Sequence, residues 1–367
     1  MKVLIVEAHS APYRDPAFEK LASDLDGQIR ILTETSIGMG AATHSEWSYR
    51  SPMEKYRKYV GKPISLSYIR YTKGYIKELL NCRPAAVVCC SFIEAILAKV
   101  ICNARVVWSA DTIRCGRYGK QRWNKIWLDW MYRRADAFWV PGAKSKAYFE
   151  QYVGNERPIY LGSYTDDCVN QMKKVNDSFK IRSSLRNELG ISQNSFVFLF
   201  VGKLIESRNI GILLGAAERI SNENQKIEIL VIGEGKENYK IEEYSNKYSN
   251  VKWIPRVRRS ELEKYYAIAD AYVHPGEEPY SLATYEAASV GLPIVASNKV
   301  GCVADCVDDG RTGYLAEFGN TEDFYDKMIC VTQGMLDQKD VLDMRDFIQN
   351  HRGPVWAAKQ LEKACGL

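Results

Sequence analysis

Residues 277–293 read Glu-Glu-Pro-Tyr-Ser-Leu-Ala-Thr-Tyr-Glu-Ala-Ala-Ser-Val-Gly-Leu-Pro, and they follow an apolar run that ends at His274. The apolar run predicts a buried strand, and Ser281 is placed to cap a helix that ends near Gly291. The start of such a helix offers free N–H groups and the positive end of the helix dipole, which together favour a phosphate. The stretch therefore predicts a strand, an acidic loop and a helix whose first turn suits an anionic ligand.

Two carboxylates of this stretch are spaced to contact different parts of one ligand. Glu286 lies five residues beyond Ser281, which is about 7 Å along the axis at ~1.5 Å per residue. That distance is comparable to the reach from a diphosphate to a ribose, so Glu286 is a candidate to accept both ribose hydroxyls. Glu278 would then meet the group on the other side of the phosphates. An ordinary capped helix with two exposed acids explains the spacing equally well, and the spacing alone leaves both interpretations open.

Short β-branched runs alternate with longer amphipathic segments throughout the chain. This alternation is typical of a parallel sheet covered by helices on both faces. The expected strands are Val3 to Val6, Ile29 to Leu32, Ala86 to Cys90, Val106 to Trp108, Ala137 to Val140, Phe196 to Val201, Ile227 to Ile232, Val251 to Ile254, Ala271 to His274 and Pro293 to Ala296.

A polar stretch without usable periodicity, Gly162 to Asp177, separates two such alternating halves of the 367-residue chain. We expect an N-terminal domain over residues 1–162, a C-terminal domain over 163–350, and a final helical segment, 351–367, with packing against the N-terminal domain as one option. Ligands of doubly wound sheets bind outside the carboxyl ends of the strands. The predicted fold class is therefore α/β, with two Rossmann-like parallel-sheet domains that face each other across a cleft.

The net charge of +5 conceals a basic half and an acidic half. Residues 1–160 hold 25 Lys and Arg against 15 Asp and Glu, whereas the remaining residues hold 25 against 30. The first half is thus expected to face an anionic partner, such as a phosphate-bearing acceptor, a membrane surface or a nucleic acid.

The ten cysteines are spread through the chain and several sit in apolar runs. Free thiols in a reducing compartment fit this distribution better than a disulfide framework. The apolar run at the start is interpreted as a first strand and not as a signal peptide, and no apolar stretch is long enough to span a bilayer. These features predict a cytoplasmic protein.

The second half resembles the retaining glycosyltransferases of family 4, which have the GT-B fold and include bacterial polysaccharide and lipopolysaccharide glycosyltransferases. Their signature is a Glu, seven intervening residues and a second Glu, followed by a small-residue helix and Gly-Leu-Pro, which Glu278 and Glu286 match. A second signature is similar to residues 201–208, with Lys203 where the family has Arg and Arg208 where it has Lys. Residues 231–235 and 265–270 look like two further landmarks of the family.

The resemblance implies how a nucleotide-diphosphate sugar is held as substrate. Cleaving the sugar–nucleotide bond releases a diphosphate, whose developing charge is stabilised by prearranged cations and helix N–H groups. Cations and amides would do this without a metal, and the Asp-x-Asp of Asp24 and Asp26 is expected to be a solvated surface pair. The donor-binding residues that the resemblance implies are Gly202, Lys203, Arg208, Gly233, Arg256, Glu278, Ser281, Leu282 and Glu286.

The first half resembles the family more weakly. Asp111 follows a predicted strand where many members carry His and some carry Asp; it either orients the sugar or accepts the acceptor's proton, or it caps the next segment. Arg14 belongs to a Tyr-Arg-x-Pro variant of the loop after the first strand. It either meets a phosphate or the acceptor, or is a surface arginine at a helix start. The implied catalytic residues are Glu278, Asp111, Lys203 and Arg208, and the implied acceptor-binding residues are His9, Arg14, Arg114 and Arg117.

Two basic segments of the first half are candidates for an anionic surface. Residues 114–134 hold seven Lys and Arg and a single acid, with Trp123, Trp127 and Trp130 at helical spacing. This pattern suits a membrane interface, although the tryptophans are equally explained as the core face of a helix. Residues 55–77 hold seven further cations with tyrosines between them. No base-reading module is visible, so nucleic acid is not an expected partner.

We therefore predict a retaining hexosyltransferase of enzyme class EC 2.4 that uses no cofactor and no metal. Its expected partners are a nucleotide-sugar donor, a glycan or lipid-linked saccharide acceptor of cell-surface glycoconjugate synthesis, and an anionic membrane surface. The expected location is peripheral, at the cytoplasmic face of the membrane. A GT-B-fold nucleotide-sugar 2-epimerase and a non-catalytic relative that binds glycans or nucleotide sugars stay open as alternatives.

Overall fold

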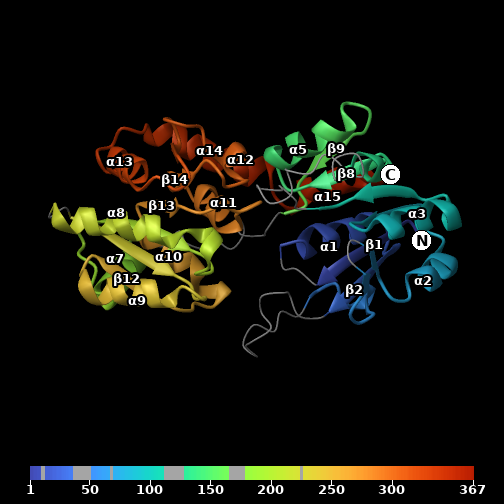
Figure 1. Cartoon of the computed structure of the whole chain (residues 1–367), viewed down its shortest axis with the longest axis horizontal. Helices are drawn as coiled ribbons and strands as arrows, with labels where there is room; N and C mark the ends of the chain where they lie inside the picture. The colour runs from blue at the N-terminus through green and yellow to red at the C-terminus, as the bar shows by residue number, and fades with distance from the viewer. Residues whose placement is uncertain (10–12, 36–50, 67–68, 111–127, 165–177, 224–225) are drawn as a thin grey trace. The chain divides into compact units, whose positions relative to one another are not determined.

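Figure 1 shows the chain as a computed structural model in which helices and strands alternate. The residues that the structure describes are 1–9, 13–35, 51–66, 69–110, 128–164, 178–223 and 226–367. The chain divides into two units, each with a parallel sheet of its own. Unit 1 consists of Met1–Asp167 and Arg352–Leu367, and unit 2 of Cys168–His351.

Unit 1 is built on a seven-stranded parallel sheet in the order β3-β2-β1-β6-β7-β8-β9. Its strands are β1 Val3–His9, β2 Ile29–Thr35, β3 Arg57–Tyr59, β6 Ala86–Cys89, β7 Arg105–Trp108, β8 Ala137–Val140 and β9 Ile159–Leu161. Its helices are α1 Asp15–Asp24, α2 Tyr75–Cys82, α3 Phe92–Cys102, α5 Ala143–Val153 and α15 Pro354–Cys365. A 3-10 turn, η2 Glu54–Tyr56, precedes β3, and an antiparallel hairpin of β4 Ile64–Leu66 and β5 Ile69–Tyr71 follows it.

Strand β1 explains why this sheet is covered on both faces. Val3 and Ile5 contribute to one apolar core, and Leu4 and Val6 contribute to another, because successive side chains of a strand point to opposite faces. Helices α1 and α15 fill the first core, whereas α2, α3 and α5 fill the second. A strand buried on both faces reads as a continuous apolar run.

Helix α15 follows unit 2 in the chain but packs in the core of unit 1 against α1. Small side chains allow the close approach: a Cβ at Gly162, after β9, would lie 2.7 Å from the Trp356 ring. Arg105 of β7 donates a hydrogen bond from Nε to the carbonyl oxygen of Ala364 over 2.8 Å. The apolar stripe of α15 consists of Ala357, Ala358, Leu361, Ala364 and Cys365.

Unit 2 has a six-stranded parallel sheet in the order β12-β11-β10-β13-β14-β15. Its strands are β10 Phe196–Val201, β11 Ile227–Ile232, β12 Val251–Ile254, β13 Ala271–His274, β14 Ile294–Ser297 and β15 Gly313–Ala316. Its helices are α7 Ser178–Glu188, α8 Ile210–Asn222, α9 Asn238–Lys247, α10 Leu262–Ile268, α11 Leu282–Ser289, α12 Val303–Cys306, α13 Thr321–Thr332 and α14 Gln338–His351, with 3-10 turns η4 Glu206–Arg208 and η5 Arg259–Glu261. The two parallel sheets confirm the predicted α/β fold class.

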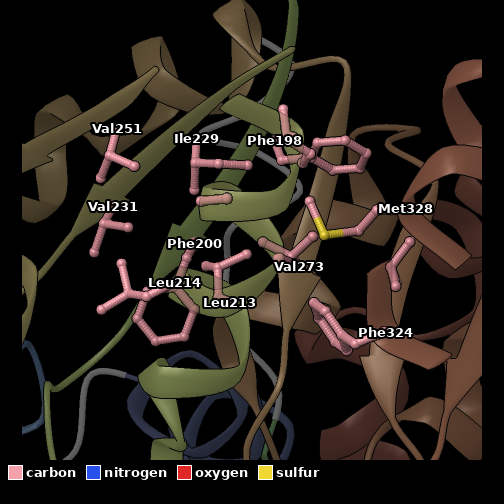
Figure 2. Close-up of a cluster of buried hydrophobic side chains, with 14 of the residues drawn as sticks. Phe198, Phe200, Leu213, Leu214, Ile229, Val231, Val251, Val273, Phe324 and Met328 are labelled. Carbon is pink, nitrogen blue, oxygen red and sulfur yellow. The ribbon is translucent and has the colours of Figure 1, made fainter. Parts of the chain in front are cut away.

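One apolar core of unit 2 lies on one face of its sheet (Figure 2). Phe198 and Phe200 of β10 are fully buried there, two residues apart as one face of a strand requires. Leu213 and Leu214 of α8 pack into the same cluster, as does α13. This packing fixes β10 at the centre of the unit.

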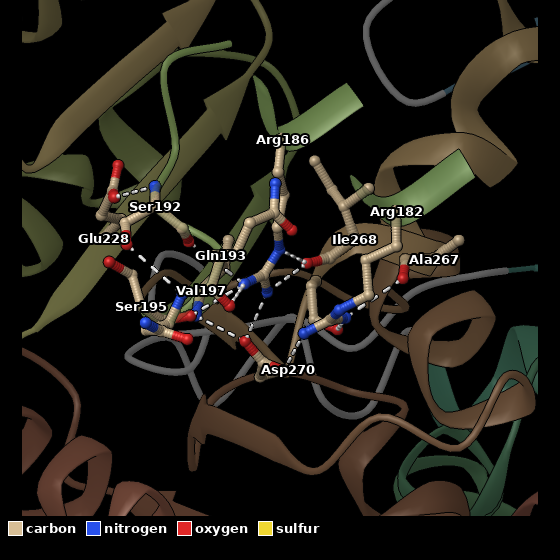
Figure 3. Close-up of polar contacts among 12 residues, drawn as sticks. Arg182, Arg186, Ser192, Gln193, Ser195, Val197, Glu228, Ala267, Ile268 and Asp270 are labelled. Carbon is tan, nitrogen blue, oxygen red and sulfur yellow. Dashed lines mark hydrogen bonds and ion pairs between the residues drawn. The ribbon is translucent and has the colours of Figure 1, made fainter. Parts of the chain in front are cut away.

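A buried arginine ties helix α7 to the rest of unit 2 (Figure 3). The Arg186 guanidinium, 1% exposed, donates to the Ile268 carbonyl oxygen over 2.7 Å and to the Ser195 carbonyl oxygen over 2.9 Å. It also pairs with Asp270, whose carboxylate accepts a hydrogen bond from the Val197 amide over 2.8 Å. Asp270, in the sequence landmark 265–270, thus joins the end of α10 to the start of β10.

Arg57, one of the seven cations of residues 55–77 that were candidates for an anionic surface, faces the interior of unit 1 instead. Its guanidinium is buried and pairs with Glu7 of β1 and with Asp15 at the start of α1. Burial lowers the pKa of Arg57 to about 10. Lys58 also pairs with the buried Glu78. Part of the positive charge of residues 55–77 is therefore paired with buried carboxylates of unit 1.

Within the described ranges, no helix is both long and apolar enough to cross a bilayer. The eight cysteines of those ranges are free thiols, and Cys89, Cys302, Cys306 and Cys365 are buried.

Candidate active site

The sheet of unit 2 reverses its winding between β10 and β13. From β10 the chain proceeds outward through β11 and β12, and it then returns to β13 on the other side of β10. In doubly wound sheets, ligands bind at this switch point, outside the carboxyl ends of the two strands. Val201 ends β10 and His274 ends β13, so the segments that follow them form the candidate site.

Glycines let these segments approach each other more closely than other residues would allow. A Cβ at Gly276 would lie 2.5 Å from Cα of Arg208 and 2.5 Å from the Ser207 carbonyl oxygen. A Cβ at Gly233, after β11, would lie 1.8 Å from the Gly202 carbonyl oxygen. The sequence indicated Gly202 and Gly233, but Gly276 was missed because a single glycine in a loop carries no spacing signal.

Arg208, in the segment after β10, forms an ion pair with Glu278, in the segment after β13. The Arg208 guanidinium pairs with the Glu278 carboxylate, and it also donates to the Glu277 carbonyl oxygen over 3.1 Å. The Glu277 amide in turn donates to the Ser207 carbonyl oxygen over 2.7 Å. The sequence-predicted cation and carboxylate are therefore brought together, with Lys203 exposed near the carboxylate.

Burial raises the pKa of the Glu278 carboxyl, because desolvation disfavours its charged form. The charge of Arg208, a hydrogen bond with Ser281 and the charge of Lys203 oppose this rise. Glu278 is thus a carboxylate in a partly desolvated position with cations at hand, which is typical of a residue that binds polar ligand groups.

His274 lies beneath Glu278 and is 1% exposed. Its Nε2 is 3.7 Å from Glu278 Oε2, and its Nδ1 is 3.4 Å from both Ser281 Oγ and Thr284 Oγ1. Burial, with the charge of Arg208 as a second cause, lowers the pKa of His274 to about 3, so the imidazole is neutral. Sequence reasoning missed this residue, whose one signal is its place at the end of a predicted strand.

Helix α11 begins at the site as the sequence predicts. Ser281 is the N-cap, and its Oγ accepts a hydrogen bond from the Thr284 amide over 3.3 Å. Leu282 is the first helical residue, so the first turn of α11, with its free amides, begins four residues after Glu278 in the sequence. Such a helix start attracts anions.

Glu286 is engaged by two residues that sequence reasoning missed. Its Oε1 accepts a hydrogen bond from Arg259 of η5 over 2.8 Å, and its Oε2 accepts one from the Tyr266 hydroxyl of α10 over 2.8 Å. The carboxylate is nearly fully buried. Tyr266 belongs to the landmark 265–270, which is the signal that could have revealed it.

Two further loops border the site at the carboxyl ends of β11 and β12. Trp253 Nε1 donates to the Gly233 carbonyl oxygen over 2.9 Å. Arg256 pairs with Glu234 in the loop that follows Gly233. The predicted donor-binding residues Gly233 and Arg256 are therefore close to each other.

The residues predicted for the acceptor side belong to unit 1. Arg14 immediately precedes α1, with its guanidinium carbon 5.6 Å and 5.4 Å from the ring centroids of Tyr13 and Tyr164. Those two rings stack on each other with centroids 4.4 Å apart. His9 is the last residue of β1. Asp111, Arg114 and Arg117 lie outside the described residues, as do Trp123 and Trp127, whereas Trp130 is described and is 43% exposed.

Among the residues that the structure describes, no three His, Cys, Asp or Glu side chains cluster as a metal site would require. Asp24 of the Asp-x-Asp pair is exposed and pairs with Lys20.

The comparisons with known proteins agree with this geometry. Residues 181–345 match the family Glycosyl transferases group 1. Spore coat protein SA of Bacillus subtilis is 27% identical over 200 residues, covering 51% of this chain and 50% of its own. Alpha-monoglucosyldiacylglycerol synthase of Acholeplasma laidlawii is 26% identical over 184 residues, covering 49% of this chain and 42% of its own. The chain thus spans about half the length of the curated relatives it matches.

A solved structure is similar over the whole chain. Anabaena HepE in complex with UDP has a TM-score of 0.77 at 16% identity and is covered completely, as is this chain. The same protein has also been solved with UDP-glucose. The likeness confirms the GT-B fold of two parallel-sheet α/β domains. The match of residues 181–345, which lie within unit 2, to a glycosyltransferase family is consistent with an enzyme of class EC 2.4.

Proposed function

We propose that the chain is a retaining glycosyltransferase of family 4 type that moves a sugar from a nucleotide-diphosphate sugar to a glycan or lipid-linked saccharide. The observation that carries the proposal is the convergence of Arg208, Glu278 and the start of α11 at the β10/β13 switch point. Cations and free amides suit a diphosphate, and a carboxylate beside them suits sugar hydroxyls.

Each group takes a distinct part of the donor in this proposal. Arg208, Lys203 and the first amides of α11, at Ser281 and Leu282, neutralise the diphosphate. Glu286 accepts the ribose hydroxyls. Glu278 holds hydroxyls of the transferred sugar and does not attack its anomeric carbon, so the acceptor adds on the face that the diphosphate leaves. Gly202, Gly233 and Arg256 border the side on which the nucleobase binds.

A thermal-shift screen against UDP-, GDP-, ADP- and dTDP-sugars tests the donor class. A ligand that binds only the folded state stabilises it by about 2.7 kcal/mol at a hundredfold excess over Kd. We expect one base class to raise the Tm selectively. A protein that none of these donors stabilises would contradict the proposed donor.

The stereochemistry of transfer is tested separately. With the identified donor and an acceptor, the anomeric proton coupling of the first-formed product should match that of the donor, and an inverted product would contradict retention. Conversion of the donor to an epimer without any acceptor would favour a 2-epimerase instead. Selective binding without turnover would favour a non-catalytic relative.

Independence from metal is part of the proposal, because Arg208 and Lys203 supply the positive charge that a metal supplies elsewhere. Transfer should survive EDTA. Complete loss in EDTA with recovery in magnesium would contradict this.

A membrane location is supported by one face of α2 and its flanks, which we call the α2 face. It consists of Lys73, Ile76, Lys77, Leu80 and Arg83, all exposed, with Ile76 at 38% and Leu80 at 56%. Residues three or four apart are neighbours on a helix, so the two apolar side chains adjoin each other and are flanked by cations. The acid of this helix, Glu78, is buried. Apolar side chains among cations suit an anionic bilayer at the cytoplasmic face.

Vesicles of phosphatidylcholine with and without phosphatidylglycerol test this location. We expect the protein to co-sediment with the anionic vesicles, and the variant I76S/L80S/K73Q/K77Q to bind them at least ~10-fold more weakly, since each basic residue contributes about 1 kcal/mol near such a surface. The control is V355S/K359Q, which removes an exposed apolar and basic pair from α15. Equal binding by all three proteins would exclude the α2 face.

A further inference from the structure

His274 is buried, and one of its two ring nitrogens, Nε2, faces Glu278 of the candidate site. No described residue forms a hydrogen bond with its Nε2, although that atom is buried. Glu278 Oε2 lies 3.7 Å from it. A buried nitrogen without a partner costs stability. Because this nitrogen lies beside the Glu278 carboxylate, a role in binding that carboxylate would account for the cost.

The neighbours of the ring decide which nitrogen carries the proton. Nδ1 faces two hydroxyl groups, of Ser281 and Thr284. Thr284 Oγ1 donates to Ser281 Oγ over 2.9 Å, and the Ser281 hydroxyl can in turn donate to Nδ1. Nε2 faces a carboxylate, which can only accept when it is ionised. The tautomer that satisfies both sides has an unprotonated Nδ1 and an Nε2–H directed at Glu278.

Charged and titratable groups face this pair from several elements. Arg208 of η4 pairs with Glu278, and Lys203 follows β10. Burial raises the pKa of Tyr272 of β13, and the nearby charge of Glu278 adds to the rise. Burial, followed by the charge of Arg208, makes a charged imidazolium unfavourable and lowers the pKa of His274, so the ring acts as a neutral donor.

We propose that His274 is a positioning residue, whose Nε2–H holds the Glu278 carboxylate against the hydroxyls of the donor's sugar when Arg208 turns to the diphosphate. This inference rests on the proposed function, in which Arg208 and Glu278 bind different parts of one donor. Without a second partner, Glu278 would be left in a partly desolvated position once Arg208 moves. The distance of 3.7 Å is closed by a small rotation of the freed carboxylate.

Two substitutions separate the two ring nitrogens. In His274→Asn, the amide occupies the place of Nδ1 and keeps the contact with Ser281 and Thr284, but nothing reaches Glu278. In His274→Gln, the longer amide places an N–H group where Nε2 lies. A purely structural role in supporting the start of α11 predicts that the Asn variant is the milder one, and the positioning role predicts the reverse.

The tautomer is measured directly by long-range ¹H–¹⁵N correlation of histidine side chains in the full chain, with His274 assigned by comparison with the Asn variant. The chain has four histidines, so the spectrum is simple. We expect the Nε2–H tautomer, unchanged through the range in which an ordinary histidine with a pKa of ~6.5 titrates. An Nδ1–H tautomer would overturn the proposal, whether or not any donor binds.

Binding of the probe pair UDP and UDP-glucose measures the consequence. For His274→Asn we expect the Kd of UDP to stay within ~2-fold and the Kd of UDP-glucose to rise about 10-fold, the effect of losing a hydrogen bond to a charged group. For His274→Gln both values should stay within ~3-fold. Equal weakening of both ligands by the Asn variant would overturn the positioning role. If the unaltered protein binds neither probe, the same comparison uses the nucleotide and the nucleotide sugar of the base that raises the Tm in the thermal-shift screen. If no base raises the Tm, the proposed donor class fails, and the tautomer measurement alone decides the inference.

Discussion

The Arg208 guanidinium contacts the carboxylate of Glu278, although each group is suited to a different part of a nucleotide sugar. In the proposed function, a diphosphate would compete with Glu278 for Arg208. The sugar hydroxyls would gain an acceptor as that competition succeeds, which would couple recognition of the two halves of the donor.

Replacing Glu278 by Gln exchanges the charged competitor for Arg208, which is also the charged acceptor for the sugar, for a neutral amide. We expect UDP to bind several-fold more tightly and transfer to fall at least ~100-fold, since loss of a charged hydrogen-bond partner costs about 1.5–3 kcal/mol per bond. Titration calorimetry with UDP and a donor-turnover assay measure the two effects. Glu277→Gln is the matched control, because its side chain neighbours the pair while its contact with Arg208 runs through the carbonyl oxygen. Near-normal transfer by the Glu278→Gln variant would show that the carboxylate has another role.

Tyr266→Phe leaves Glu286 Oε2 without its hydroxyl donor in a buried position. We expect the free energy of unfolding to fall by about 1–3 kcal/mol, the cost of an unsatisfied buried acceptor.

The ratio of the Kd values for UDP and 2′-deoxy-UDP reports whether Glu286 binds the ribose. The two Kd values should differ less in Glu286→Gln than in the unaltered protein. An unchanged ratio would show that Glu286 does not bind the ribose.

The neutral state of His274 predicts how stability depends on pH. Burial lowers its pKa from the ordinary value of 6.5 to about 3 in the folded chain, so between these values the unfolded state binds more protons and stability rises with pH. Stability should accordingly be lost as the pH falls below about 6.5, with a slope of up to ~1.4 kcal/mol per pH unit from this group. Urea denaturation of the unaltered protein and of His274→Asn across this pH range measures the contribution of His274 to the free energy of unfolding. The Asn variant should lose less stability, and parallel curves would contradict a buried neutral imidazole.

Gly276→Ala introduces a Cβ 2.5 Å from Cα of Arg208 and from the Ser207 carbonyl oxygen, so the backbone of one loop must shift. We expect a loss of a few kcal/mol in stability, roughly that of other overpacked sites, together with weakened UDP binding. The control is Gly211→Ala in α8, where a Cβ meets nothing within 4 Å. That variant should gain about 0.4–1 kcal/mol. A Gly276→Ala protein with unchanged melting and binding would exclude the close approach of the two loops.

The ten strands predicted from sequence are all present, because strands buried on both faces leave uninterrupted apolar runs such as Phe196–Val201. The strands that were missed are short or polar. Strand β3 begins at Arg57, whose burial depends on Glu7 and Asp15, and no local pattern reveals partners so distant in sequence. Spacing likewise placed Ser281 at a helix start, whereas the engagement of Glu286 by Arg259 and Tyr266 arises only from the packing of η5 and α10 against α11.

The packing of α15 into the core of unit 1 has a consequence for the order of events during synthesis. Unit 2 is one continuous stretch of chain, so it can complete its core while translation continues. The apolar face of β1 that α15 covers stays open until residues 354–365 have left the ribosome. Until then the uncovered sheet of unit 1 exposes an apolar surface on the nascent chain, which favours aggregation.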